Sequence, residues 1–160
     1  MFKIKLEQGK TMEVSKETFW HTSSHILAHA VKRLYPNAQL GVGPAIEQGF
    51  YYDFKVEKPF EPSDLIAIEN EMQNIIKENL EEVREELNRK DAIKLFEELN
   101  EPFKVELIKE LEGDEIISAY RQGSFIDLCR GPHLPSTGAV KAFKLLSTSA
   151  VYWKGDENNI

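Results

Sequence analysis

The chain has 160 residues and a mass of 18.4 kDa, with 41% hydrophobic and 29% charged residues. This size and balance favour one globular domain with little room for a second core, and they exclude a multidomain enzyme. The net charge of −7 argues against a protein that binds nucleic acid through bulk electrostatics. No run is apolar enough to span a membrane and no signal peptide is recognisable, so we expect a cytoplasmic location.

The first elements along the chain are a short hairpin and a long helix. Residues 2–6 alternate apolar and basic side chains, and the alternation resumes at 12–14, which predicts a β-hairpin extension over residues 1–15. Ser15 can cap a helix that continues to Tyr35, because Pro36 disfavours a helical residue before it. We assign residues 16–160 to the main domain.

The middle of the chain contains a turn-rich stretch and a second helix. Glycines over 41–49 indicate turns, and the aromatic run 50–54 predicts a buried strand. Pro62 begins a helix whose apolar residues keep a 3.6-residue spacing, and we expect this helix to pack on a sheet.

The second half is expected to be mainly antiparallel sheet. Residues 91–99 predict a short amphipathic helix, whereas 81–87 and 103–108 fit either helix or strand. Residues 116–120, 124–128 and 142–153 read as strands. Strands without regular βαβ alternation predict an α+β fold, with helices packed on an antiparallel β-sheet.

Two pairs of soft metal ligands stand out. His21 and His25 lie four residues apart on one face of the first predicted helix, and His29 follows after another four. The only cysteine, Cys129, precedes His133 by four residues, in a loop that Gly131 and Pro132 keep from being helical. His21, His25, Cys129 and His133 could bind zinc tetrahedrally or leave one position for water.

Each of these residues also has a simpler interpretation. His29 is best read as a packed histidine outside the ligand set, and a lone cysteine is commonly a small buried hydrophobe. Taken alone, Lys104 reads as a surface lysine, and the pair Tyr51 and Tyr52 as core.

Several motifs together resemble one known family. The stretches HTSSHILAHA (21–30), GP (43–44), GFYYD (49–53), DLCRGPH (127–133) and YWKGD (152–156) closely resemble the editing domain of bacterial-type threonyl-tRNA synthetases, in order and spacing. The wider superfamily, which includes the editing domains of alanyl-tRNA synthetases, shares the H-x-x-x-H and C-x-x-x-H pairs. The motifs CRGPH and GFYYD resemble the threonyl branch.

The resemblance implies a hydrolytic proofreading enzyme that deacylates Ser-tRNA(Thr) and spares Thr-tRNA(Thr). A methyl group provides only about 1–3 kcal/mol of discrimination in a synthetic site, so a second, hydrolytic site is needed. The implied partners are the 3′ end of a threonine-acceptor tRNA and a seryl group, with no membrane. Only 20 residues precede His21, so we expect a fragment or a freestanding editing domain, without the class II aminoacylation domain.

The resemblance also implies roles for individual residues. His21 would orient or deprotonate the water, Lys104 would stabilise the oxyanion or hold a second water, and His25 would assist catalysis. Asp127 would recognise the α-ammonium of the substrate. The residues expected to bind substrate are Tyr52, Asp127, Cys129, His133 and Gly43.

Three alternatives remain open from the sequence. The preferred mechanism requires no cofactor, whereas an alanyl-type deacylase would use zinc at His21, His25, Cys129 and His133. A covalent mechanism through Cys129 is a third and less favoured mechanism. The chain could also be a non-catalytic tRNA-binding module. Because the net charge is negative, we expect weak and salt-sensitive tRNA affinity.

Overall fold

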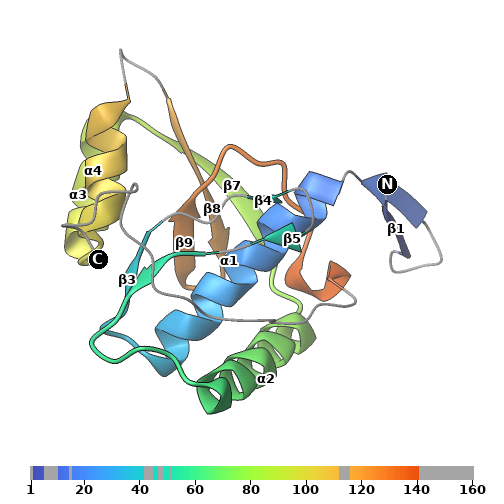
Figure 1. The fold of residues 1–160 in the computed structure, drawn as a ribbon. Helices are drawn as coiled ribbons and strands as arrows, with labels where there is room; N and C mark the ends of the chain where they lie inside the picture. Colours follow the sequence, from blue (N-terminus) through green and yellow to red (C-terminus); the bar gives the residue numbers. More distant parts are fainter. Residues whose placement is uncertain are drawn as a thin grey trace.

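The computed structural model describes residues 2–5, 11–14, 16–41, 45–46, 49–50, 52–111 and 116–140. Helices and antiparallel strands alternate irregularly along the chain, which confirms the predicted α+β class (Figure 1). In chain order the elements are β1 (Phe2–Lys5), β2 (Thr11–Val14), α1 (Lys16–Leu34), β3 (Gln39–Leu40), β4 (Ala45–Ile46), β5 (Gly49–Phe50), β6 (Phe54–Lys55), α2 (Pro62–Glu78), β7 (Glu82–Leu87), α3 (Arg89–Glu98), α4 (Pro102–Glu110), β8 (Ile117–Gln122), β9 (Phe125–Leu128) and η2 (Thr137–Ala139). Over these ranges, no helix has both the length and the apolar character that crossing a bilayer requires.

The predicted N-terminal hairpin is confirmed. Strands β1 and β2 pair antiparallel, with Phe2 opposite Val14 and Lys5 opposite Thr11. Figure 1 shows this hairpin beside the N-terminal end of α1. The division of the chain into an extension over 1–15 and a domain over 16–160 stays a prediction.

Helix α1 ends one residue before the predicted Tyr35. Its last residue is Leu34, two residues before Pro36. The ammonium group of Lys32 donates to the carbonyl oxygens of Pro36 (3.0 Å) and Ala38 (2.7 Å), so a cation satisfies carbonyl groups just beyond the end of the helix. The predicted cap, Ser15, lies outside the described residues.

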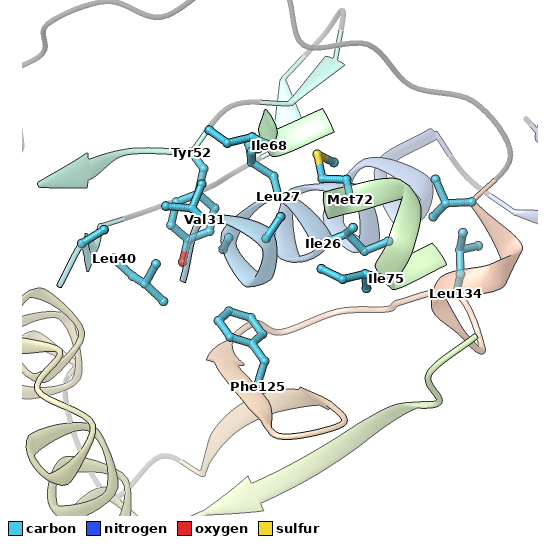
Figure 2. Packing of buried hydrophobic residues seen from close by; sticks show 14 of the residues in the cluster. Ile26, Leu27, Val31, Leu40, Tyr52, Ile68, Met72, Ile75, Phe125 and Leu134 are labelled. Atoms are coloured by element: carbon cyan, nitrogen blue, oxygen red, sulfur yellow. The ribbon is translucent and has the colours of Figure 1, made fainter. Parts of the chain in front are cut away.

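Helix α2 packs against α1, so the expectation that it packs on a sheet is wrong. Its buried residues Ile68, Met72 and Ile75 interdigitate with Ile26 and Leu27 of α1 (Figure 2). The reason is geometric. Helix α1 is buried on all sides over residues 22–31, so it lies in the interior and offers a face to the apolar stripe of α2, whose ridge fits its groove.

A three-stranded antiparallel sheet, in the order β7-β8-β9, occupies the second half. The first segment left open, 81–87, contains β7, because its backbone pairs with β8 from Glu82 opposite Gln122 to Leu87 opposite Ile117. The second, 103–108, is helical and belongs to α4. The strands predicted near 116–120 and 124–128 are confirmed as β8 and β9, and that predicted over 142–153 lies outside the described residues.

The aromatic run 50–54 does not form one strand, which corrects the prediction. Phe50 belongs to β5, paired with β4, and Phe54 belongs to β6, paired with β3. Between them Tyr52 is buried and its ring stacks on that of Phe54 (centroids 4.9 Å apart). Side chains two residues apart already share one side of a strand, so periodicity could not reveal the interruption.

Among the described residues, the buried hydrophobic side chains form two clusters, which corrects the expectation of a single core. The larger joins α1 and α2 with Leu40, Phe125 and Leu134 (Figure 2). The smaller joins α3, α4 and β8 around Phe96, which is fully buried. The short helices α3 and α4 pack on each other, so their apolar faces form a satellite cluster of their own.

Candidate functional site

Four segments bring the predicted site residues together. Helix α1 supplies His21 and His25, α4 supplies Lys104, and β9 with the loop after it supplies residues 127–133. Tyr52 comes from the turn before β6. The predicted contributor Gly43 lies outside the described residues.

Asp127 is the centre of a buried charged network. Its side chain is 1% exposed, and one carboxylate oxygen, Oδ1, lies 2.8 Å from the ammonium nitrogen of Lys104. The Leu128 backbone N–H also donates to Oδ1 (2.7 Å), and the Tyr52 hydroxyl donates to Oδ2. These three donors occupy the carboxylate that was predicted to recognise an α-ammonium group. That role stays a prediction.

The pKa of Asp127 and the pKa of Tyr52 are shifted in opposite directions. Burial alone would raise the pKa of Asp127, but the positive charge of Lys104 and the hydrogen bonds from Lys104 and Tyr52 more than offset this effect, and the pKa is lowered. Burial, and then the charge of Asp127, raise the pKa of Tyr52 well above its usual value. Tyr52 is therefore a protonated donor to an ionised Asp127 at neutral pH.

Lys104 is buried, so the reading of it as a surface lysine is wrong. Only 3% of the residue is exposed, and its charge also lies 5.2 Å from the centre of the Tyr52 ring. One turn earlier, buried Glu101 pairs with Lys32 of α1 (2.8 Å) and accepts from the Leu40 N–H (2.7 Å). These contacts tie the start of α4 to α1 and β3.

His25 lies between the charged network and the loop. Its Nε2 is 3.6 Å from Oδ2 of Asp127, and its ring meets that of His133 edge-on, with centroids 4.5 Å apart. Burial is the main cause that lowers the pKa of His25 to about 4. Its Nδ1 is buried and makes no hydrogen bond within the described residues. His25 is thus a neutral imidazole with an available ring nitrogen.

The sulfur of Cys129 has contacts from three sides. The Gly131 N–H donates to Sγ (3.3 Å), while Nε2 of His133 and Nδ1 of His21 lie 3.3 and 3.7 Å from it. Burial raises the pKa of the Cys129 thiol to about 11, so the thiol stays protonated at neutral pH and is a poor nucleophile. Gly131 has a φ of 76°, and a Cβ there would clash with the Tyr120 ring, so the loop requires glycine.

His133 is held by two residues that the sequence did not single out. Its ring stacks on Tyr120 (centroids 3.9 Å apart, planes at 7°). Its Nδ1 lies 3.3 Å from Oε2 of Glu82, whose side chain is 1% exposed. Burial lowers the pKa of His133 to about 2. Glu82 lies among many acidic residues and Tyr120 belongs to no motif, so only the pairing of β7 with β8 reveals their role.

His29 lies apart from the sulfur, as expected for a packed histidine. Its ring stacks on Phe125 (centroids 4.9 Å apart), and its Nδ1 is 3.1 Å from Oε1 of Gln122. Burial lowers the pKa of His29 to about 4. Its hydrogen-bond partner is thus a side chain.

Three of the predicted zinc ligands converge. The ligand atoms of His25, Cys129 and His133 lie within 4.8 Å of one another, and His21 is outside this group. Two imidazoles and one sulfur suit zinc, and the unbonded Nδ1 of His25 and the carboxyl group on Nδ1 of His133 also fit a metal site. A fourth position would remain for water or substrate.

Comparison with known proteins finds a matching family model and similar chains. A family model described as the threonyl and alanyl tRNA synthetase second additional domain matches residues 117–159. The chain is 60% identical to the threonine–tRNA ligases of Clostridium tetani and of Acetivibrio thermocellus over 147 residues, which is 92% of its length. Over 159 residues it is 55% identical to the threonine–tRNA ligase of Clostridioides difficile.

The chain spans less than a quarter of these relatives, 23% of the first two and 24% of the third. The matches, over 147 to 159 of the 160 residues, cover both the histidine pair of α1 and the loop after β9. The resemblance is therefore confirmed: the chain matches the region of threonyl-tRNA synthetases that carries their second additional, or editing, domain.

Proposed function

We propose that this chain hydrolyses the ester bond of Ser-tRNA(Thr) and spares Thr-tRNA(Thr), in the cytoplasm. The observation that carries the proposal is the convergence of His21, Lys104 and the Cys129–His133 loop in a chain that matches threonyl-tRNA synthetases. Its partners would be the 3′ end of the tRNA and the other domains of a synthetase.

The chemistry needs a water, a base and positive charge near the carbonyl oxygen. His21 takes a proton from the attacking water, and Lys104 places a charge in a buried site, where a developing oxyanion is stabilised far more than in water. Asp127 keeps Lys104 fixed until the oxyanion forms. The proton that His21 accepts returns to the ribose oxygen as the ester breaks.

Water is the better nucleophile for this site. The Cys129 thiol has a raised pKa, whereas an ester yields readily to an activated water. If zinc binds at His25, Cys129 and His133, it supplies a Lewis acid beside the substrate, as in an alanyl-type deacylase. Selectivity for serine would require that the site exclude the extra methyl group of threonine by size.

Deacylation of Ser-tRNA(Thr) by the purified chain tests the proposal. We expect His21→Ala and Lys104→Met to lower the rate at least about 100-fold, as the loss of an oxyanion donor does. Lys109→Met is the matched control, because Lys109 is exposed on the same helix, and its rate should equal that of the wild type. Equal loss in the control, or an inert wild-type chain, would refute the proposal.

A chelator separates the two mechanisms. Activity that survives chelation in the same assay favours the metal-free route, and activity that chelation removes and zinc restores favours the zinc route. An inert chain that still binds tRNA would support the non-catalytic alternative. Binding should be weak and fall steeply with salt, because the net charge is −7.

A further inference from the structure

Three buried polar side chains form a continuous path behind the proposed site. Nδ1 of His29 lies 3.1 Å from Oε1 of Gln122, whose amide nitrogen donates to Oε1 of Glu82 (2.7 Å). The other carboxyl oxygen of Glu82 lies 3.3 Å from Nδ1 of His133. Glu82 and Gln122 face each other in the β7–β8 register, so the sheet itself sets this part of the path.

The proposed reaction does not require this path. Glu82 is 1% exposed in its side chain and Gln122 is fully buried, and burying such groups is costly even when they are hydrogen-bonded. Only the last contact, from Glu82 to His133, reaches the site. That contact acts on the ring of His133.

Stacking alone leaves the ring of His133 in one of two positions. Tyr120 fixes the plane of the ring, since the two planes lie within 7°. A rotation of the ring by half a turn about its Cβ–Cγ bond keeps the ring plane and the stacking, but it exchanges a nitrogen for a carbon on each edge of the ring. The contact with Glu82 distinguishes the two positions, because only one of them places Nδ1 against the carboxyl group and Nε2 3.3 Å from Sγ of Cys129.

We propose that Glu82 is a positioning residue: held by Gln122 and His29, it sets which edge of the His133 ring faces Cys129 and which ring nitrogen carries the proton. A single partner at Nδ1 selects one tautomer of a neutral imidazole. For its effect on rate, this inference rests on the proposed hydrolysis. Its effect on His133 does not depend on any activity.

The test is nitrogen NMR of the His133 ring, which is accessible because the chain has only 4 histidines. In the wild type we expect one fixed tautomer, with widely separated resonances of the two ring nitrogens. In Glu82→Met the two resonances should move toward each other as tautomers mix. Glu85→Met, on the same strand but partly exposed and paired with Arg121, should keep the wild-type resonances.

Kinetics give the second readout. Glu82→Met should lower kcat for Ser-tRNA(Thr) about 10- to 100-fold and leave KM within about twofold of the wild-type value. In Glu82→Gln, kcat should be within about threefold of the wild-type value. A folded Glu82→Met chain with wild-type His133 resonances and kcat would overturn the inference. If Glu82→Met does not fold, Glu82→Gln decides, since an amide partner must shift the Nδ1 resonance and an unchanged one refutes the contact. An inactive wild type would refute the proposed function and leave the NMR test intact.

Discussion

Replacing Asp127 with asparagine removes the negative charge that faces Lys104 in the interior. The two charged atoms are 2.8 Å apart, and their side chains are 1% and 4% exposed. Asparagine has nearly the same shape and can still accept from the Tyr52 hydroxyl. The substitution therefore isolates the charge from the packing.

The expected cost follows from the geometry. At 2.8 Å and an effective dielectric constant of about 20, the Coulomb attraction is about 6 kcal/mol. Desolvation of the two ions offsets much of this, but removal of one partner leaves the other charge buried and unpaired. We expect Asp127→Asn to lower the free energy of unfolding by about 3–5 kcal/mol. Adding Lys104→Met should restore part of this loss, because no charge is then left unpaired.

Urea unfolding of the wild type, both single variants and the double variant measures these terms. Glu86→Gln is the control. It breaks the exposed pair with Arg84 and should change stability by less than about 1 kcal/mol. The reasoning fails if Asp127→Asn costs no more than this control, or if the double variant loses the sum of the two single losses.

Three further predictions concern neighbouring groups. Tyr52→Phe removes a donor to an ionised carboxylate and should cost about 1.5–3 kcal/mol in urea unfolding; no loss would contradict the bond to Asp127. Because the pKa of His29 is lowered to about 4, the unfolded chain binds more protons between pH 4 and 6.5, so stability falls as pH is lowered through this window. Between pH 7 and pH 5, the free energy of unfolding of His29→Gln should fall by about 2 kcal/mol less than that of the wild type. Parallel curves of unfolding free energy against pH would show that His29 does not contribute. Since the pKa of the Cys129 thiol is about 11, iodoacetamide should alkylate the folded chain at pH 8 about 100-fold more slowly than a free cysteine, and a normal rate would contradict the raised pKa.

The local parts of the site could be predicted from the sequence. His21 and His25 share a helix, and Cys129 and His133 share a short loop, so spacing along the chain already places each pair. The proximity of the two pairs does not follow from spacing. It was expected only because the motifs resemble a known family.

The parts that depend on long-range pairing could not be predicted. Lys104 appears in sequence as one basic residue among acidic ones, and it is buried because Asp127, 23 positions later, neutralises it. Glu82 was in a segment that fitted helix or strand equally well. Only its pairing with β8 decides the strand and places Glu82 opposite Gln122. Propensity carries no information on such partners.

The central claim is that this site releases serine and spares threonine. The most direct measurement compares single-turnover deacylation of Ser-tRNA(Thr) and Thr-tRNA(Thr), prepared on the same tRNA, by the purified chain. Steric exclusion of the extra methyl group should exceed the discrimination that a missing methyl contact gives, so serine should be released more than about 200-fold faster. Equal rates for the two substrates, or faster release of threonine, would contradict the account.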